Sequence, residues 1–81
     1  MRIELSERAR RSYNDAPESV CKLFNKQALL LLGDLRHPSL HAKKYDEARG
    51  VWQARINRDW RVYFFIEDDL YYIVDMIKHP K

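Results

Sequence analysis

The sequence has few of the residues that would provide cross-links, flexible linkers or membrane spans. Cys21 is its single cysteine, which excludes an internal disulfide, and no group of cysteines and histidines has zinc-site spacing. Two glycines and three prolines leave no stretch with the composition of a linker. The longest apolar run, Ala28–Leu32, is five residues and is far too short to span a bilayer. No signal peptide is visible, so we expect a cytoplasmic protein.

The chain does contain enough apolar residues for one small core. Hydrophobic residues make up 46% of it and aromatic residues 12%. Dividing 81 residues between two domains would leave neither half enough buried surface to fold. We therefore expect a single domain over residues 1–81.

Positive charge is concentrated in one part of the sequence. The formal net charge is +3, yet residues 41–63 carry six Lys or Arg against three Asp or Glu, and residues 64–81 carry two against four. This asymmetry favours an anionic partner. A solvated face rich in lysine and arginine would give the same count, so charge alone leaves both interpretations open.

The first forty residues have the patterns of one strand and two helices. Residues 2–5 alternate polar and apolar side chains and predict a short edge strand. Ser6 can cap a helix that runs to about Tyr13. Asp15 predicts the cap of a second helix, which runs from Pro17 to about Leu35 with its proline in the first turn. The two helices would form an αα-hairpin with one apolar face.

Beyond Pro38 the apolar residues recur at every second position, which is the period of a strand. Turn-forming residues at 57–59 and 67–69 separate the clearest segments, and a shorter one precedes them. The candidate strands are His41–Tyr45, Val51–Ile56, Trp60–Ile66 and Leu70–Ile77. The predicted class is α+β, with the N-terminal strand and the αα-hairpin packed on an antiparallel sheet of about four strands.

The turn at residues 57–59 determines which side chains face each other across the sheet. If Ile56 pairs with Trp60, the indole and phenyl rings of Trp52 and Phe64 fall on one face. The opposite face then carries two pairs, Arg55 with Arg61 and Gln53 with Tyr63.

Two arginines directly opposite each other repel, at a cost of up to about 1 kcal/mol. A phosphate would turn this repulsion into a bidentate site, because guanidinium groups match its oxygens. Alternatively Asp46, Glu47 or Asp75 neutralises the pair, which would make it a structural ion network. The sequence leaves both alternatives open.

Other basic and titratable residues flank this strand pair. Lys43 and Lys44 precede it, Arg58 lies in its turn, and Lys78, His79 and Lys81 follow the last strand. His79 can act as a general acid or base, or it is an exposed histidine without a role. Tyr63 can stack on a base or transfer a proton, or it is an ordinary strand tyrosine. His37 and His41 are interpreted as surface or packing residues.

Cleavage of RNA without a metal needs a base for the 2′-hydroxyl, cations for the phosphorane charge and an acid for the leaving oxygen. Arg55 and Arg61 suit the second task. His79 and Tyr63 are the visible candidates for the first and third, apart from an acid such as Glu47. No carboxylate cluster suggests bound magnesium, so we expect no metal and no cofactor.

These segments, taken in order, resemble the RelE/ParE toxin superfamily over essentially the whole chain. The resemblance rests on the order and spacing of four motifs that follow a strand and a helical hairpin. They are Leu35-Arg36-His37-Pro38, Lys43-Lys44, Val51-Trp52-Gln53-Ala54-Arg55-Ile56 and Asp59-Trp60-Arg61-Val62-Tyr63.

The resemblance implies the toxin of a type II toxin–antitoxin module. RelE-like members are mRNA endonucleases that act in the ribosomal A site without a metal and inhibit translation, and a cognate antitoxin wraps the toxin. Arg55 and Arg61 match the family's basic strand positions. Lys78-His79 falls where some branches carry an arginine and others a catalytic histidine. The resulting predicted catalytic set is Arg55, Arg61, His79 and Tyr63, and the predicted RNA-binding set is Lys43, Lys44, Gln53, Arg58, Lys78 and Lys81.

Two alternatives to a ribonuclease stay open at this point. ParE-like members share the fold and poison DNA gyrase, so gyrase is the alternative partner to mRNA and the ribosome. Gln53 stands where well-studied RelE members have a second lysine, and the tyrosine that commonly follows the Lys78-His79 position is absent. A catalytically impaired binding module with the toxin fold is therefore the third possibility.

Overall fold

Residues 1–79, the part of the chain that the computed structural model describes, form two α-helices, a 3-10 turn and one five-stranded sheet. The strand order is β1-β5-β4-β3-β2, in which β2 to β5 are antiparallel and β1 runs parallel to β5. The predicted α+β class is confirmed, and the N-terminal strand joins the antiparallel part as a fifth strand at the sheet edge. The elements are β1 Arg2–Leu5, α1 Glu7–Asp15, α2 Glu18–Gly33, η1 Pro38–Leu40, β2 Lys43–Asp46, β3 Val51–Arg55, β4 Trp60–Glu67 and β5 Leu70–Lys78.

Helix α1 begins at the predicted cap and ends later than predicted. The Ser6 hydroxyl accepts from the backbone N–H of Ala9 at 3.0 Å and donates to the carbonyl of Val74 at 2.6 Å, so one side chain caps α1 and ties it to β5. The prediction that Asp15 caps α2 is wrong, because Asp15 is the last residue of α1. Pro17 takes the N-cap position in an extended conformation without a side-chain cap, since only two residues separate the helices.

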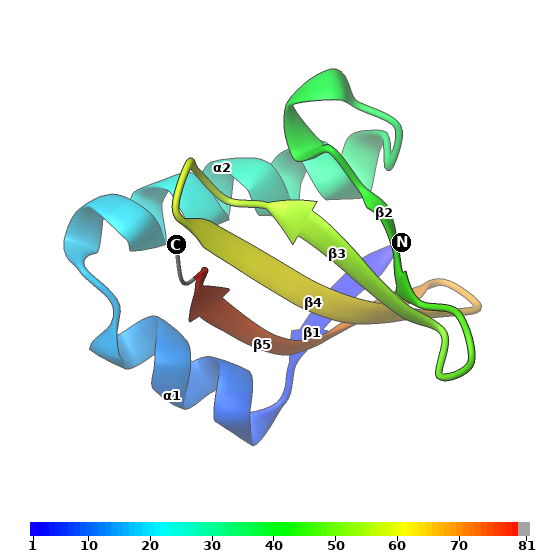
Figure 1. Ribbon diagram of the computed structural model, residues 1–81, viewed down its shortest axis with the longest axis horizontal. Coiled ribbons are helices and arrows are strands. Elements are labelled where there is room, and N and C mark those ends of the chain that lie inside the picture. The colour runs from blue at the N-terminus through cyan, green and yellow to red at the C-terminus, as the bar shows by residue number, and fades with distance from the viewer. Residues whose placement is uncertain (80–81) are drawn as a thin grey trace.

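Helix α2 covers one face of the sheet (Figure 1). Its buried side chains recur at intervals of four, three and four residues, which places them on one stripe of an α-helix. They are Val20, Phe24, Gln27 and Leu31. A narrow gap of about 10 Å³ lies between this stripe and strands β3, β4 and β5, which shows that the helix packs directly on the sheet.

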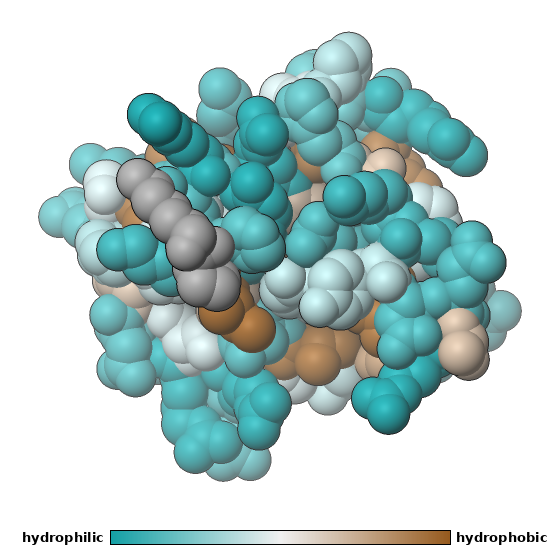
Figure 2. Space-filling model, viewed as in Figure 1, coloured by the Kyte–Doolittle hydropathy of each residue, from teal (hydrophilic) through white to brown (hydrophobic). Residues whose placement is uncertain are grey.

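The core lies between α2 and the sheet and is centred on Phe64. Its fully buried ring stacks on Trp52 with centroids 6.3 Å apart and meets Tyr71 edge-on at 5.8 Å. Burial of a side chain of this size contributes about 1.5–3 kcal/mol. Because strand side chains alternate, the neighbours of Phe64 along β4 point to the other, open face of the sheet. In Figure 1 the sheet passes in front of α2, and Figure 2, drawn from the same side, shows hydrophilic side chains there around a smaller number of hydrophobic ones.

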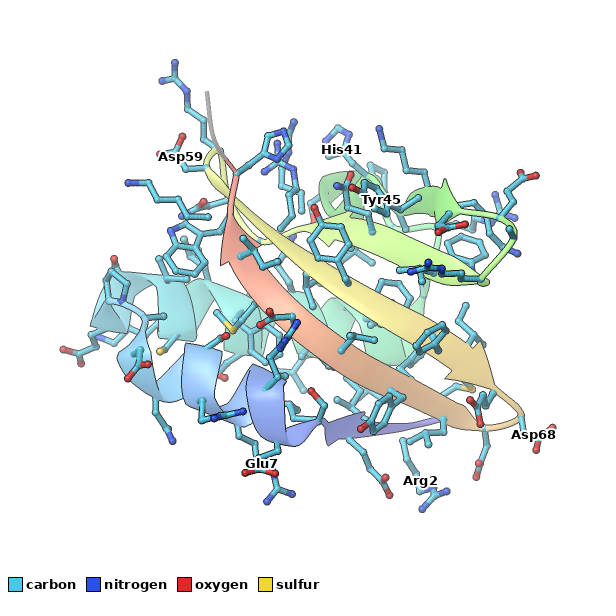
Figure 3. The ribbon with its side chains drawn as sticks, turned by 60° about the horizontal axis from the view of Figure 1, so that its bottom comes forward. Arg2, Glu7, His41, Tyr45, Asp59 and Asp68 are labelled. Atoms are coloured by element: carbon cyan, nitrogen blue, oxygen red, sulfur yellow. The ribbon has the colours of Figure 1, made fainter. Side chains whose placement is uncertain are left out.

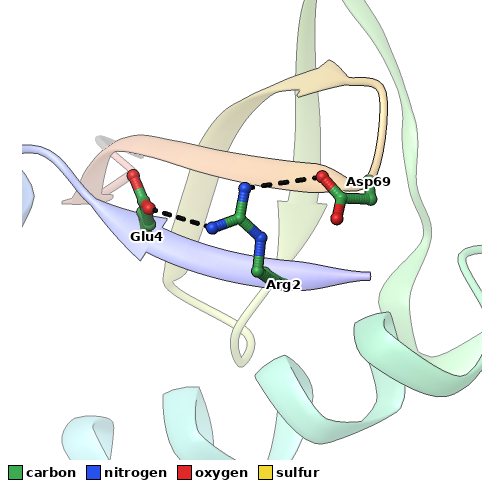
Figure 4. Close-up of polar contacts among 3 residues, drawn as sticks. All are labelled: Arg2, Glu4 and Asp69. Carbon is green, nitrogen blue, oxygen red and sulfur yellow. Dashed lines mark hydrogen bonds and ion pairs between the residues drawn. The ribbon is translucent and has the colours of Figure 1, made fainter.

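The edge strand β1 is held by its backbone more than by its charges. Arg2 forms ion pairs with Glu4 at 3.7 Å and Asp69 at 3.5 Å (Figure 4). All three side chains are more than half exposed, so these pairs contribute at most about 1 kcal/mol each. The parallel pairing of residues 2–5 with residues 70–73 supplies the main attachment. Within the described residues, no helix has the length and hydropathy needed to cross a membrane.

Candidate functional site

The predicted register of β3 and β4 is confirmed. Arg55 pairs with Arg61, and Gln53 pairs with Tyr63. Trp52 and Phe64 are also partners and belong to the core face. The two arginines therefore lie next to each other on the open face, directly behind the part of the core that α2 covers.

A pocket of about 370 Å³ opens beside this arginine pair. Strand β2 supplies one of its walls through Lys43, which is the register partner of Gln53. Its lining residues are His41, Ala42, Lys43, Gln53, Arg55 and Arg61. Three of the six carry a positive charge and none is acidic, so the pocket concentrates positive potential in a concave surface. This "cation pocket" is suited to an anion with several oxygen atoms.

The guanidinium of Arg61 is positioned by the turn between β3 and β4. Its Nη1 donates to the carbonyls of Asn57 at 2.8 Å, Trp60 at 3.0 Å and Arg58 at 3.3 Å. Asn57 in turn shapes this segment, because its Oδ1 accepts from the backbone N–H groups of Asp59 and Trp60, both at 2.9 Å. All three Arg61 bonds use Nη1, which leaves Nη2 and Nε for a ligand.

Arg55 is held through its backbone instead. Gln27, buried on α2, donates from Nε2 to the carbonyl of Arg55 at 2.8 Å and to that of Ser39 at 3.1 Å. The Arg55 side chain is exposed, and within residues 1–79 it forms no ion pair or hydrogen bond. Helix α2 thus fixes the backbone position of Arg55, while the Arg55 guanidinium stays available to bind a ligand.

No carboxylate within residues 1–79 neutralises the arginine pair. Asp46 pairs with Arg49 at 3.8 Å, and the Oδ1 of Asp75 accepts from the hydroxyl of Ser12 at 2.6 Å. Neither Arg55 nor Arg61 forms an ion pair among the described residues. Within the described residues, the arginine pair is therefore not part of a structural ion network. Nor do the described residues contain a group of three or more His, Cys, Asp or Glu placed to hold a metal ion.

The remaining predicted basic residues are spread over both faces and the ends of the strands. Lys44 does not reach the cation pocket: its Nζ lies over the ring of Trp52, 5.5 Å from the centroid, on the face opposite Lys43. Arg58 is exposed in the β3–β4 turn, and Lys78 is exposed at the end of β5, opposite Trp60. Lys81 lies outside the described residues. The predicted RNA-binding roles of these residues stay predictions.

The two predicted proton-transfer residues lie outside the lining of the cation pocket. The backbone N–H of His79 donates to the carbonyl of Asp59, which places this histidine beside the β3–β4 turn. Tyr63 is half-buried, and its hydroxyl accepts from Gln53 Nε2 at 3.1 Å. Its ring meets Tyr45 edge-on with centroids 5.0 Å apart. Tyr63 is thus connected to the cation pocket through Gln53.

His41 is the titratable lining residue that the sequence analysis interpreted as a surface or packing residue and did not place in the site. It ends η1 in the left-handed conformation, with φ 47° and ψ 42°, and this reversal turns the chain into β2. Figure 3 shows His41 and Tyr45 on the β2 side of the sheet and Asp59 at the β3–β4 turn. The available signal was the position of His41, between a proline-initiated turn and a basic strand. His37, in contrast, is a local cap, since its Nδ1 accepts from the N–H of Ser39 at 3.2 Å.

No protein-family model and no curated protein matches this sequence. Solved structures do match its fold. The YoeB/ParE toxin from Agrobacterium tumefaciens superposes with a TM-score of 0.82 at 10% identity, covering 99% of this chain and 100% of that one. This chain has a RelE-like fold. The archaeal RelE–RelB complex from Pyrococcus horikoshii gives a TM-score of 0.81 at 14% identity over 99% of this chain and 96% of the other. A YoeB dimer from Staphylococcus aureus gives 0.80 at 17% identity, with 100% and 98% coverage.

This RelE-like fold accounts for the order of the sequence motifs. The first segment follows the end of α2 and leads into η1, the lysine segment begins β2, and the two arginine segments contain β3 and the first half of β4. The predicted resemblance to the superfamily is thereby confirmed at the level of the fold. At identities of 10–17% the structural likeness extends no further than that.

Proposed function

We propose that this chain is the toxin of a toxin–antitoxin pair and that it cuts mRNA on the ribosome at the cation pocket, without a metal. The RelE-like fold supports the toxin role. The observation that carries the proposal is the arginine pair, in which Arg55 and Arg61 lie side by side with no carboxylate partner in residues 1–79. Repulsion between two arginines without an acidic partner lowers the stability of the fold, and a bound RNA phosphate would relieve that repulsion.

The proposed reaction is an in-line attack of the 2′-oxygen on the adjacent phosphate. The new bond joins the 2′-oxygen to phosphorus, and the bond from phosphorus to the 5′-oxygen breaks, giving a 2′,3′-cyclic phosphate and a 5′-hydroxyl. Arg55 and Arg61 bind the phosphate oxygens and stabilise the charge of the phosphorane. His41 lines the pocket and takes the proton of the 2′-hydroxyl. His79 and Tyr63 are the candidates that return a proton to the leaving 5′-oxygen.

The proposed protein partner is a cognate antitoxin. The similar structures include the RelE–RelB complex from P. horikoshii and a heterotetrameric YoeB–YefM toxin–antitoxin complex from S. aureus. This chain has exposed hydrophobic side chains on both of its layers, with Leu29 on α2 70% exposed and Tyr45 on β2 61% exposed. An antitoxin that covers these residues would remove them from water and stabilise the complex.

The test is induced expression in growing bacteria, followed by mapping of mRNA 5′ ends. We expect growth arrest and cuts at codon boundaries, both abolished by Arg55→Ala. Lys26→Ala is the matched control, because it removes an exposed cation from α2 instead and should leave the arrest unchanged. Intact transcripts with DNA breaks would replace the proposal with gyrase inhibition. Normal growth with the wild-type chain would favour a binding module without catalysis.

Cleavage rates of two histidine variants would show which residue takes the proton of the 2′-hydroxyl. His41→Ala and His79→Ala each remove one histidine, and loss of a general acid or base costs about 10²–10⁴-fold in rate. We expect His41→Ala to slow cleavage on isolated ribosomes by such a factor while leaving mRNA binding intact. Full cleavage activity in His41→Ala, with loss in His79→Ala, would transfer the role of the base to His79.

A further inference from the structure

A second hollow of about 270 Å³ lies on the same face as the cation pocket. Its lining includes Tyr45, Tyr63, Asp75, Ile77 and, from α1, Arg8. The rings of Tyr45 and Tyr63 are in edge-to-face contact with an interplanar angle of 69°, which fixes their relative orientation. Tyr45 nevertheless remains 61% exposed. An exposed ring that is already oriented is a surface on which a planar ligand can stack at low entropic cost.

The second hollow and the cation pocket are adjacent and share a polar link. Gln53 lines the cation pocket, Tyr63 lines the second hollow, and the Gln53 amide donates to the Tyr63 hydroxyl at 3.1 Å. Along β4, Arg61 and Tyr63 are two residues apart, which is about 7 Å in a strand. This is the separation between a phosphate and the base of a neighbouring nucleotide. An RNA phosphate at the arginines would therefore bring a base to the tyrosines.

The polar groups of the second hollow match one base better than the others. The Asp75 Oδ1 accepts from Ser12 Oγ at 2.6 Å and from the N–H of Met76 at 2.8 Å, so both of these bonds use one oxygen. Within residues 1–79 the Oδ2 has no hydrogen bond, and Arg8 has no ion pair. Guanine presents two adjacent N–H donors, N1–H and N2–H, which the two free lone pairs of Oδ2 can accept, and its O6 and N7 accept from arginine. Adenine, cytosine and uracil each lack that pair of adjacent donors.

We propose that the second hollow is a nucleobase subsite that stacks the base on Tyr45 and prefers guanine through Asp75. The proposal rests on the proposed function, since it requires that the neighbouring cation pocket binds an RNA phosphate. It assigns Asp75 a role in addition to its contact with α1. It also makes Tyr45 a base-stacking residue of the same RNA site, while the preference for guanine comes from Asp75.

The test is titration of the intact chain with the four nucleoside 3′,5′-bisphosphates at one fixed salt concentration, followed by NMR or calorimetry. We expect guanosine bisphosphate to bind most tightly. Tyr45→Ala should weaken its binding about 10-fold, the size of one lost stacking contact, and Tyr45→Phe should leave it unchanged. Asp75→Asn should bring the four affinities within about 2-fold, because a donor replaces the free acceptor while Oδ1 still accepts from Ser12. Leu29→Ala, which changes an exposed residue on α2, is the control.

The outcomes separate this proposal from the one on which it rests. Unchanged affinity in Tyr45→Ala, or retained guanine preference in Asp75→Asn, overturns the subsite. If Arg55→Ala still abolishes binding in that case, the cation pocket stands as a phosphate site. If none of the four bisphosphates binds, or if Arg55→Ala leaves their affinity unchanged, both the base subsite and the phosphate site are overturned. Circular dichroism of Asp75→Asn checks that the contact between α1 and β5 persists.

Discussion

Arg55 and Arg61 are neighbours in the sheet, yet the protein holds them in different ways. The guanidinium of Arg61 is bonded to three carbonyls of the β3–β4 turn, whereas that of Arg55 has no hydrogen bond among the described residues. Removing Arg61 therefore removes both a charge and a brace of the turn. Arg55 is the cleaner probe of the site, because its loss changes the charge with little effect on local structure.

This difference predicts opposite effects on stability. Arg55→Gln should raise the free energy of unfolding by up to about 1 kcal/mol at low ionic strength, because it relieves a cross-strand repulsion. The gain should shrink as salt is added, since screening already weakens the repulsion in the wild type. Arg61→Gln should instead lower the free energy of unfolding by about 1–2 kcal/mol through its lost hydrogen bonds. Urea denaturation at two salt concentrations measures the free energy of unfolding of each variant. Equal changes of the same sign in the two variants would contradict the different roles given to Arg55 and Arg61.

At the scale of the elements, Gln27 is the residue that joins the helical layer to the site. It is 7% exposed, and its amide donates to one carbonyl before β2 and to one at the end of β3. One buried side chain therefore sets the distance between α2, η1 and the strand position of Arg55. Helix α2 contributes to the cation pocket in this way without lining it.

Replacing Gln27 should affect both stability and the site. Gln27→Met keeps the side-chain length but leaves two carbonyls without this donor, so we expect the free energy of unfolding to fall by about 1–3 kcal/mol. Binding of phosphate-containing ligands should weaken as well, because Arg55 loses its support. Lys26→Ala, one residue away on the exposed side of α2, should change neither quantity. Stability within 0.3 kcal/mol of the wild type, on the order of the error of such measurements, would show that water replaces the amide.

At the scale of the whole molecule, the described residues give one clear dependence of stability on pH. Burial raises the pKa of the Tyr71 phenol above its ordinary value of 10.0, and the nearby Asp34 carboxylate adds to the rise. The folded state therefore holds this proton more tightly than the unfolded chain. The resulting stability is fully present below pH 10.0 and is lost as pH rises through the folded-state pKa.

We therefore expect the free energy of unfolding to fall above about pH 10, the ordinary tyrosine range. Tyr71→Phe should make this fall shallower, because it removes the ionising group but keeps the ring against Phe64. Denaturation curves between pH 8 and 11, a window chosen around that ordinary value, measure the slope. Tyr45→Phe, at an exposed position, is the matched control. Identical slopes in Tyr71→Phe and the wild type would refute this linkage.

The sheet could be predicted from the sequence where the pattern was strict. Alternation on both sides of the Asn57 turn was sufficient to pair Arg55 with Arg61, and the structure has that pair. Features that depend on a single residue's backbone could not be predicted. His41 lines the cation pocket after a left-handed residue conformation that ends η1. Alternation along β2 places Lys43 and Lys44 on opposite faces, but which of the two faces the pocket depends on the register of β2 with β3. The predicted cap of the second helix was wrong for a similar reason, since Asp15 continues α1 instead of capping α2.

The parallel pairing of β1 with β5 has a consequence for how the chain acquires its structure. Arg2 pairs with Leu70 and the Ser6 hydroxyl binds the carbonyl of Val74, so the first strand meets the last one across nearly the whole sequence. During synthesis the N-terminal segment emerges first and must wait, with its edge unpaired, until β5 has left the ribosome. Contacts this distant in sequence form slowly. We expect β1 to dock last, after the β2 to β5 meander has already assembled the cation pocket.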